Sequence, residues 1–575
     1  MHVVVLREIP QDPQVIASWN DLARNMDRPE VFLTHEWALA ASRAFSDTVQ
    51  PLVFLVYESH RLCGVAALAT PRESTRSALF LTASTADYCD ILSDPAMSGE
   101  VLAAIFQALH RTGVQDVVLA NVPLDSPTLR ELPRMAESLH YHLHSRAAFD
   151  CGLILLGSTE ERQAILQTVR RKDRERRGLK KMGQMGPVRL THLTSKLTDS
   201  DLMPIFLAHI SRFLATDRVS PLVLPERRAF LKELSRLLGQ AGWLKISQIE
   251  IDGQPVAWNY GFHFCGSWFW YLPTFEIQYE HLSPGSCLLR LLLEEGCVDP
   301  SVSRLDLGLG DEAYKERFSN AVQPTRDLHL STNLLRHKKI VSRDFLATCV
   351  TRFPRVATKV RKARDVSRRI RERGLIRTVA YISRKASKYL LSDEEVMLFQ
   401  APSIERPGEG TISLAPLDWN QLASAAISNF QDSQTLAYLM RCAKRFKEKT
   451  VSGFVLHTEE DEVAKHFLWV NSYDGFHLSE IDHKLEPSDP GAVMIFDCWT
   501  PVAHRGHGYY ATALRLAVAM LAQQDKRVWI FSAAANTPSV RGICKGGFVY
   551  RFSLVRKRRM GHPLVTRRDK ASSMQ

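Results

Sequence analysis

The chain has 575 residues, of which 45% are apolar and 24% are charged. This composition is typical of a folded chain with several domains, and it excludes the disordered and collagen-like classes. The ten cysteines are scattered without a C-x-x-C pair, so neither a metal site nor a disulfide framework is expected. The sequence shows no signal-peptide pattern and no apolar run of the roughly 18 to 20 residues that span a bilayer. A cytoplasmic location is therefore predicted.

The positive charge of the chain is concentrated in one segment. The formal net charge is +12, but residues 336–390 alone hold 18 Lys and Arg against three acidic residues, so the rest of the chain is close to neutral. This segment is predicted to be a basic helical linker, which in the simplest interpretation is solvated. The next alternative is peripheral contact with the anionic inner face of a membrane. Nucleic acid is not the expected partner, because the segment carries no motif that reads a base sequence.

Residues 1–185 are predicted to form a first α/β unit. Stretches with helical periodicity and stretches with strand alternation follow one another through this part of the chain. The expected helices cover residues 15–24, 34–45 and 101–111, and the expected strands cover residues 51–58, 62–70 and 114–120. A basic helix over residues 158–182, with the run RRKDRERRGLKK, closes the unit.

Residues 186–335 are predicted to form a second unit with a similar order of elements. The expected strands cover residues 188–193, 244–251, 255–264, 267–272 and 304–309, and the expected helices cover residues 202–214, 226–240 and 285–295. Asp252 and Gly253 stand between two alternating runs, which indicates a hairpin. The aromatic side chains of these strands are expected to form core rather than a platform for carbohydrate.

Residues 391–575 are predicted to form a third unit after the linker. The expected helices cover residues 419–429, 433–449 and 510–524, and the expected strands cover residues 453–457, 465–472, 492–499 and 527–532. The tail after Pro563 is polar and is expected to be frayed. The predicted fold class is α/β, or α+β, with three consecutive units of mixed sheets flanked by helices.

The third unit carries the clearest chemical pattern of the chain. The strand over residues 492–499 leads into a loop and then into the helix over residues 510–524. Gly506 and Gly508, with His507 between them, let backbone N–H groups approach a pyrophosphate, and the start of the helix adds a favourable field. Arg505 adds a charged donor. The pattern therefore predicts an anion site.

This loop resembles motif A of the GNAT acyltransferases, which follows the pattern R/Q-x-x-G-x-G/A. Arg505 and Gly508 match the pattern, whereas Tyr510 stands where the family has its last small residue. The resemblance implies a GNAT fold for residues 391–575 and binding of acetyl-CoA or another acyl-CoA. The donor-binding residues implied here are Arg505, Gly506, His507, Gly508 and Tyr510.

A segment farther along the chain carries the same resemblance. Asn536 and Ser539, followed by the run KGGF at residues 545–548, resemble the family's N-x-x-A/S and K-x-G-F segment. Asn536 and Ser539 are accordingly further candidates for donor binding. The tyrosine that protonates the departing thiolate in the family aligns with Ile543. The resemblance therefore leaves three alternatives: another residue is the acid, solvent is the acid, or this unit does no chemistry.

An attacking amine must also lose a proton to a general base. Asp497 lies on the strand before the loop, where GNAT enzymes often hold a base. Glu480 is the second candidate. For each carboxylate the alternative is structural, either an ion pair or simple exposure to solvent.

A further resemblance covers roughly residues 15–330. The run LSPGSCLL at residues 282–289 and the run LDLGLGDEAYKERF at residues 305–318 resemble the signature of CelD-like acyltransferases. That group is linked to cellulose and exopolysaccharide synthesis, and it shares a tandem GNAT layout with Fem-type aminoacyltransferases. The resemblance implies that the first two units are GNAT-like as well.

The first of these runs contains candidates for a second phosphate site. Ser283 can cap the helix that begins there, and Gly285 leaves room for a ligand. Asp306, in the second run, is a candidate catalytic carboxylate. The alternatives are a capped structural helix and a carboxylate that is paired with a neighbouring cation.

Together these patterns predict an acyl-CoA-dependent acyltransferase without a metal. The expected acceptor is an amine or a sugar-derived group on a small molecule or glycan precursor, and a role in exopolysaccharide or envelope synthesis is implied by resemblance alone. Two alternatives stay open. One is a Fem-like aminoacyltransferase that uses aminoacyl-tRNA, and the other is a non-catalytic protein that binds acyl-CoA as a scaffold or regulator.

Overall fold

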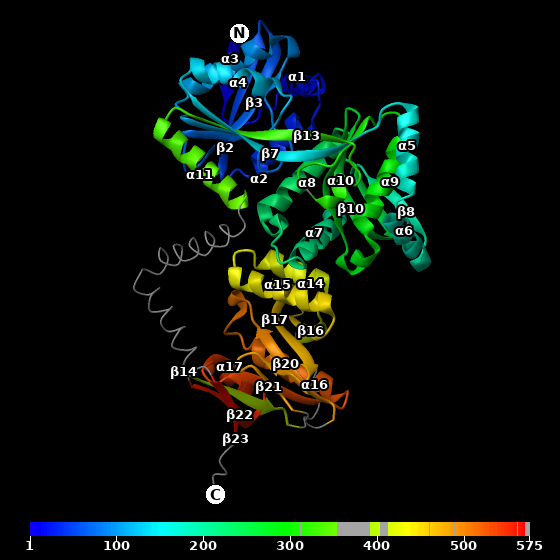
Figure 1. Ribbon diagram of the computed structural model, residues 1–575, viewed down its shortest axis with the longest axis vertical. Helices are drawn as coiled ribbons and strands as arrows, with labels where there is room; N and C mark the ends of the chain where they lie inside the picture. The colour runs from blue at the N-terminus through cyan, green and yellow to red at the C-terminus, as the bar shows by residue number, and fades with distance from the viewer. Residues whose placement is uncertain are drawn as a thin grey trace. The chain divides into compact units, whose positions relative to one another are not determined.

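The computed structural model describes residues 1–310, 312–352, 391–402, 412–458, 461–486, 490–559 and 562–569 (Figure 1). The chain divides into two compact units. The N-terminal unit comprises Met1–Arg212 and Leu224–Thr348, and the C-terminal unit comprises Phe213–Val223 and Cys349–Gln575. Both combine mixed sheets with flanking helices, which confirms the predicted fold class. Within the described ranges, no helix has the length and apolar character that crossing a bilayer requires.

The N-terminal unit is built on one sheet of 13 strands, in which β5 pairs beside β3 and the others follow the order β1-β2-β3-β4-β6-β13-β7-β12-β11-β10-β9-β8. The strands are β1 (His2–Leu6), β2 (Val49–Glu58), β3 (Arg61–Pro71), β4 (Ser77–Phe80), β5 (Leu92–Ser93), β6 (Asp116–Pro123), β7 (His142–Leu155), β8 (Val188–Leu193), β9 (Ile246–Ile251), β10 (Gln254–Phe264), β11 (Ser267–Phe275), β12 (Arg304–Asp306) and β13 (Ala321–Ser331). The helices are α1 (Pro13–Arg24), α2 (His35–Ala44), α3 (Ser98–Arg111), α4 (Pro127–Ser138), α5 (Thr159–Arg170), α6 (Asp173–Met185), α7 (Asp199–Leu214), α8 (Pro225–Gln240), α9 (Pro284–Val298), α10 (Ala313–Glu316) and α11 (Leu334–Arg352).

The N-terminal unit consists of two halves with the same arrangement of strands. The first half holds β1–β6 with α1–α4, and the second holds β8–β12 with α5–α10. Each half contains one parallel pair, β4 with β6 and β11 with β12. Parallel neighbours need a crossover connection, which α3 supplies in the first half and α9 in the second.

Two long strands are exchanged between the halves. β7 follows the first half in the chain but pairs with β12 of the second, and β13 follows the second half but pairs with β6 of the first. β7 and β13 also pair with each other and run side by side across the unit (Figure 1). The two halves therefore share one continuous sheet.

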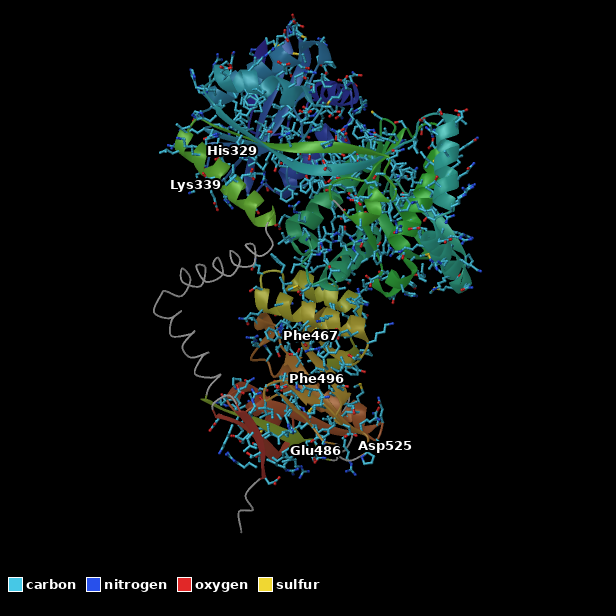
Figure 2. The ribbon with its side chains drawn as sticks, in the orientation of Figure 1. His329, Lys339, Phe467, Glu486, Phe496 and Asp525 are labelled. Atoms are coloured by element: carbon cyan, nitrogen blue, oxygen red, sulfur yellow. The ribbon has the colours of Figure 1, made fainter. Side chains whose placement is uncertain are left out.

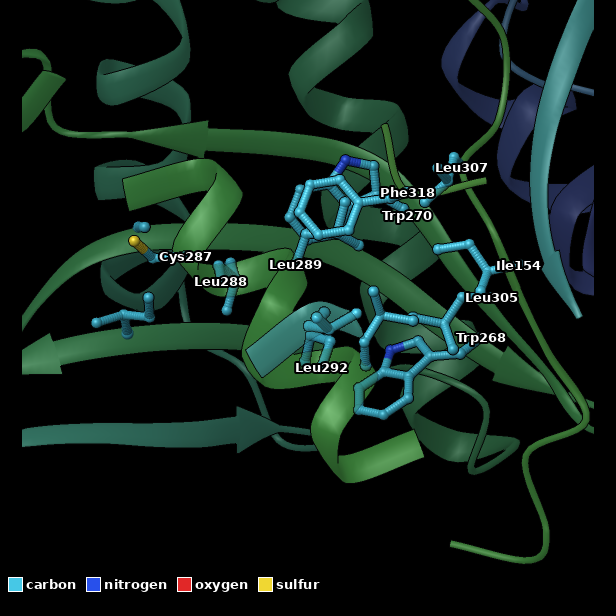
Figure 3. Packing of buried hydrophobic residues seen from close by; sticks show 14 of the residues in the cluster. Ile154, Trp268, Trp270, Cys287, Leu288, Leu289, Leu292, Leu305, Leu307 and Phe318 are labelled. Carbon is cyan, nitrogen blue, oxygen red and sulfur yellow. The ribbon is translucent and has the colours of Figure 1, made fainter. Parts of the chain in front are cut away.

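Helices α5 and α6 pack on the second half, although they lie in the stretch that the sequence assigned to the first unit. Both contact α9. Gly178 of α6 allows this close approach, because a Cβ there would meet the carbonyl oxygen of Leu282 at 2.4 Å. Val169 and Met182 join the core of the second half, where Trp268 and Leu292 are also buried (Figure 3). The aromatic strands of this half form core, as the sequence predicts.

The C-terminal unit is built on a sheet of eight strands in the order β15-β16-β17-β20-β21-β14-β22-β23, beside the short pair β18–β19. The strands are β14 (Leu391–Gln400), β15 (Ile412–Pro416), β16 (Ser452–Thr458), β17 (Asp461–Ser472), β18 (His477–Leu478), β19 (His483–Lys484), β20 (Ala492–Trp499), β21 (Arg527–Ala533), β22 (Val549–Arg559) and β23 (His562–Asp569). The helices are α14 (Trp419–Ser428), α15 (Ser433–Glu448), α16 (Tyr509–Ala522) and α17 (Thr537–Lys545). β20 and β21 are parallel and joined through α16, as β11 and β12 are through α9.

One prediction about a charged segment is wrong, and another falls mostly outside the described residues. The tail after Pro563 was expected to be frayed, but residues up to Asp569 form β23 and pair with β22. The linker predicted over residues 336–390 begins within α11, and its part from residue 353 to residue 390 lies outside the described residues.

Candidate active site

The candidate site lies where β20 and β21 part. Their parallel pairing runs from the pair Ala492–Arg527 to the pair Ile495–Ile530 and then stops. On its other edge β20 stays paired with β17 as far as Trp499, so only one side of β20 opens. The register with β17 shifts around Asp497, whose φ of 44° lies in the left-handed region. This local bulge turns β20 away from β21.

A cavity of about 420 Å³ fills this opening. Figure 2 labels Phe496 on β20, which is one of its lining residues. The cavity brings together six of the residues that the sequence proposed, from four separate segments of the chain. These are Glu480, Asp497, Arg505, Tyr510, Asn536 and Ser539. Gly506, His507 and Gly508 belong to the loop that leads from Arg505 into α16.

The loop before α16 has the backbone that the sequence predicts for close approach of a ligand. Gly506 and Gly508 have φ values of 87° and 79°, and no described atom lies within 4 Å of a Cβ built on either residue. Gly508 is the N-cap of the 14-residue helix α16, so the first N–H groups of that helix face outward at this point. An anion at this position would be stabilised by these N–H groups and by the helix dipole.

Arg505 is one of the residues that line the cavity, and its side chain contacts two neighbours. Its Nε donates to the carbonyl oxygen of Thr500 at 3.1 Å, and its guanidinium lies 5.2 Å from the ring centre of Trp499. His507 bonds the carbonyl oxygen of Arg505 through Nδ1 at 3.0 Å, and its ring stacks on Tyr509. These contacts hold the Arg505 side chain in place beside the cavity.

Tyr510 stands on the inner side of the α16 start. Its hydroxyl lies 3.3 Å from Oγ of Ser539, while Asn536 caps α17 by accepting from the Ser539 N–H. Burial raises the pKa of the Tyr510 phenol well above its usual value, and the neighbouring Cys498 adds to this effect. Tyr510 is therefore protonated over the physiological pH range and is able to donate.

His466 of β17 is a cavity residue that the sequence analysis missed. Its Nδ1 lies 2.7 Å from Oγ1 of Thr500, and its ring stacks on Tyr510 with centroids 5.2 Å apart. Burial lowers its pKa to about 3, so the imidazole is neutral. Its Nε2 is buried and finds no partner among the described residues. No local signal marks this histidine, because it lies in an ordinary alternating strand.

The two candidate bases differ in their surroundings. Asp497 forms an ion pair with Arg445, and each side chain is 27% exposed. The backbone carbonyl of Asp497 accepts from the hydroxyl of Tyr438 at 2.9 Å. Glu480 is exposed, and its carboxylate accepts from Oγ of Ser479 at 3.2 Å. Glu480 therefore has the more available carboxylate.

A second cavity of about 530 Å³ adjoins the first. The two share Glu480, Phe496, Asp497 and Phe531 as lining residues. The second cavity also has Glu448 and Asp474 in its wall, so its lining is rich in carboxylates. Glu480 thus faces both spaces at the point where they meet.

Ile543, at the position where GNAT enzymes have their tyrosine, lies in the core. It is fully buried among the apolar residues that α16 and α17 contribute. A hydroxyl at this position on α17 would point into that core instead of the cavity. The geometry therefore separates this position from the donor site.

The residues proposed for a second phosphate site lie in the N-terminal unit. Ser283 precedes α9 with a φ of 56°, and its side chain accepts from Nε of Arg174 at 2.7 Å instead of capping the helix. A Cβ on Gly285 would reach the ring of Phe275 at 3.5 Å, an ordinary contact, so this position does not require glycine. Asp306 ends β12 with 1% exposure, where it accepts from the Tyr88 hydroxyl at 3.0 Å and from the Gly308 N–H at 2.9 Å.

Comparison with known families supplies one direct match. Residues 169–316 match the family model of an acetyltransferase (GNAT) domain. The chain contains a GNAT acetyltransferase domain. The match covers about a quarter of the chain and contains β11, α9 and β12, with Ser283, Gly285 and Asp306. No curated protein matches the chain.

Solved structures offer similar folds at low identity. FemX is 8% identical over 57% of this chain and 97% of its own, with a TM-score of 0.41. The C-terminal domain of a putative lysylphosphatidylglycerol synthetase from Agrobacterium fabrum is 12% identical over 58% and 96%, with a TM-score of 0.37. A tandem GNAT protein from the clavulanic acid biosynthesis pathway is 11% identical over 58% and 99%, with a TM-score of 0.34. Likeness of this degree carries no conclusion about the reaction, and the resemblance to CelD-like enzymes stays a prediction.

Proposed function

We propose that this protein is an acyl-CoA-dependent N-acyltransferase whose acyl donor binds in the C-terminal unit, in the cavity between β20 and β21. One observation carries the proposal. The parallel pair opens beside the start of α16, and the opening collects Glu480, Asp497, Arg505, Tyr510, Asn536 and Ser539 around about 420 Å³.

The donor would bind with its pyrophosphate on the loop of Gly506 and Gly508. The exposed backbone and the start of α16 supply N–H donors, and Arg505 supplies a positive charge. The pantetheine arm would then run between β20 and β21 and bring the thioester to Tyr510 and His466. His466 is neutral, and we assign its Nε2–H to the carbonyl oxygen of the thioester, where it would stabilise the developing negative charge.

The acceptor would enter through the adjoining cavity. Its wall carries Glu448, Asp474, Glu480 and Asp497 against Arg445, so the local charge favours a cationic group. A primary amine has this charge before reaction. This complementarity supports N-acylation over transfer to a sugar hydroxyl.

The chemical step would be direct attack on the thioester. The ammonium group of the acceptor first loses one proton to solvent. The amine nitrogen then forms a bond to the carbonyl carbon, Glu480 takes a second proton from this nitrogen, and the carbon–sulfur bond breaks. Tyr510 gives its proton to the departing sulfur, and both side chains return to their starting state by exchange with solvent. Tyr510 thereby takes the role for which Ile543 has no suitable group.

The buried position of Ile543 favours one alternative, a protein that binds acyl-CoA without turnover. The exopolysaccharide or envelope context rests only on the CelD-like resemblance and is proposed on that basis. Acetyl-CoA is the donor that we would test first.

Calorimetry on the full chain tests the donor site. The wild-type protein is expected to bind acetyl-CoA, and the double change Arg505→Glu with Gly508→Glu is expected to abolish binding, because it places two negative charges at the pyrophosphate position. Lys444→Glu on the exposed side of α15 is the matched charge-reversal control and should bind like wild type.

Three outcomes separate the alternatives. Binding that the double change removes, together with thiol release on addition of primary amines, supports the enzyme. Binding without thiol release supports the non-catalytic alternative. Binding that survives the double change, or no binding by the wild type, contradicts the proposed donor site, and in the second case aminoacyl-tRNA becomes the donor to test.

A further inference from the structure

A separate polar cavity lies in the first half of the N-terminal unit. It measures about 70 Å³ and is bordered by residues from three segments of the chain, 26–33, 88–98 and 123–130. A water needs about 10 to 15 Å³ of such volume. The cavity is therefore large enough for one small polar group of a ligand, with an open side toward solvent for the remainder.

Arg28 is one of the residues that border this cavity, and its guanidinium is only partly hydrogen-bonded. Its Nε bonds Oε1 of Glu30 at 2.7 Å, and the guanidinium packs 4.5 Å from the ring centre of Tyr88. Its side chain is only 13% exposed. Both terminal nitrogens, Nη1 and Nη2, are buried, and neither has a hydrogen-bond partner in the part of the chain that the structure describes.

Glu30, which pairs with Arg28, also has a carboxylate oxygen without a hydrogen-bond donor among the described residues. It is 2% exposed, and its Oε1 also accepts from Nη2 of Arg304 at 3.1 Å. Its second oxygen, Oε2, is buried and is left without a donor by the described residues. A buried polar atom without a partner costs about 1 to 3 kcal/mol. Unpartnered polar atoms of residues that border a cavity indicate a bound molecule that forms hydrogen bonds with them.

The network continues to the GNAT domain matched in the second half. Tyr88, which lies in the cavity wall, donates to Asp306 at the end of β12. Arg304, two residues earlier on the same strand, holds Glu30. The cavity is thus connected through two side chains to β12.

The unpartnered atoms define the chemistry of the ligand. The two Nη groups of one guanidinium lie in a plane and match the two oxygens of a carboxylate. Oε2 of Glu30 needs an N–H or O–H donor close to that carboxylate. The exposed carboxylates of Asp27 and Asp125 also border the cavity, so an ammonium group fits better than a hydroxyl or a doubly charged phosphate.

We propose that this cavity binds the head group of an amino acid, with its carboxylate on Nη1 and Nη2 of Arg28 and its ammonium group on Oε2 of Glu30. The side chain of the amino acid extends toward the open side of the cavity. The site is independent of the donor cavity in the C-terminal unit, so either can fail without the other.

The test uses the full chain and the common L-amino acids, each titrated separately by calorimetry and thermal shift. At least one is expected to bind and to raise the melting temperature. Its carboxamide, which lacks the carboxylate, and its deamino analogue, which lacks the ammonium group, are expected to bind at least about tenfold more weakly.

Arg28→Lys is the matched substitution, because it keeps the charge beside Glu30 and removes the planar pair of donors. It should weaken binding by about tenfold or more, whereas Arg134→Lys, an exposed change on α4, should leave binding unchanged. Circular dichroism shows whether Arg28→Lys folds, and the carboxamide comparison on wild-type protein decides the question if it does not. If no amino acid binds, the cavity holds only water and the proposal is overturned; equal binding of the carboxamide, or full affinity in folded Arg28→Lys, overturns it as well.

Discussion

The parallel pair β20–β21 of the C-terminal unit and the parallel pair β11–β12 of the N-terminal unit differ in what lies at the end of the pairing. Beyond Ile495 and Ile530 in the C-terminal unit there is a cavity of about 420 Å³. The β11–β12 pairing ends at the pair Phe269–Asp306, where Asp306 is buried and accepts hydrogen bonds from the Tyr88 hydroxyl and the Gly308 N–H. The β20–β21 pair thus ends beside a cavity, whereas the β11–β12 pair ends in a buried and hydrogen-bonded carboxylate.

The strand exchange accounts for this difference. It joins both halves of the N-terminal unit in one sheet, so a loop of the first half can deliver Tyr88 to the end of β12 in the second. In the C-terminal unit, β14 takes the equivalent place beside β21, but it contributes no described residue to the cavity lining. Topology thus indicates where a donor site can form, and the side chains that arrive from outside the strand pair decide whether it is open.

The family match includes only one of these two strand pairs. It covers residues 169–316 and so includes the β11–β12 pair, whereas the cavity beside β20 and β21 lies outside the matched residues. The donor site proposed in the C-terminal unit consequently depends on its geometry.

The largest effect is expected from Glu480→Gln. Loss of the general base should lower kcat by about 1,000-fold with little change in the affinity for acetyl-CoA. Thiol release in the presence of primary amines measures kcat, and calorimetry measures the affinity. Glu486→Gln, an exposed carboxylate labelled in Figure 2, is the control. Unchanged turnover in Glu480→Gln would remove this residue from the mechanism and direct attention to Asp497.

His466→Phe is expected to have the next largest effect. Phenylalanine keeps the stacking on Tyr510 but removes Nε2, so kcat should fall by about 100-fold. The carbonyl ¹³C resonance of labelled acetyl-CoA bound to the protein should also move upfield relative to wild type, because a hydrogen bond to the carbonyl is lost. His483→Phe on β19 serves as the control. An unmoved resonance would show that His466 does not contact the thioester.

Buried Glu30 in the N-terminal unit should make the free energy of unfolding depend on pH. Burial raises the pKa of Glu30 to about 7 from 4.5, although Arg28 and Arg304 oppose the shift. The folded state therefore binds more protons between these pH values, so the Glu30 contribution is fully present below pH 4.5 and is lost as pH rises through about 7. Glu30→Gln should remove up to about 1.4 kcal/mol per pH unit from this slope.

Urea unfolding at several pH values within this window measures the slope. The exposed Glu58→Gln, at the end of β2, should keep the wild-type slope. Identical slopes in wild type and Glu30→Gln would mean that Glu30 ionises normally in the folded protein.

The smallest effects are expected from alanine substitutions of Gly508 and Gly285, the glycines that the sequence placed in the two candidate phosphate sites. Gly508→Ala should destabilise the protein by about 1 kcal/mol, because an L-residue is strained at its positive φ. Gly285→Ala should stabilise the protein by about 0.5 kcal/mol, because it lies in α9 with room for a methyl group. Thermal unfolding measures both. Equal destabilisation by the two changes would contradict the difference in backbone between them.

The sequence predicted the local secondary structure around the candidate site. The strand, the glycine loop and the helix start around Arg505 are contiguous in the chain, and glycine at positive φ leaves a recognisable pattern. Six proposed residues accordingly line one cavity. His466 was missed because its surroundings are formed by Thr500 and Tyr510, which are distant in sequence. The sequence of β17 around His466 gives no indication of these contacts.

Non-local pairing was the part of the fold that the sequence did not reveal. The exchange of β7 and β13 depends on partners far along the chain, which periodicity does not identify. The charged strands were missed for a related reason. Glu394 of β14 faces Arg556 of β22, and the two form an ion pair, so charges that suggest a solvated segment are satisfied across the sheet.

The most direct test of the central claim is a crystal structure of the full chain with a non-hydrolysable acyl-CoA analogue. We predict the pyrophosphate on the loop of Gly506 and Gly508 and the acyl carbonyl beside Nε2 of His466, between β20 and β21. An analogue bound instead at the start of α9, beside Ser283 and the end of β12, would contradict the account and place the donor site in the N-terminal unit.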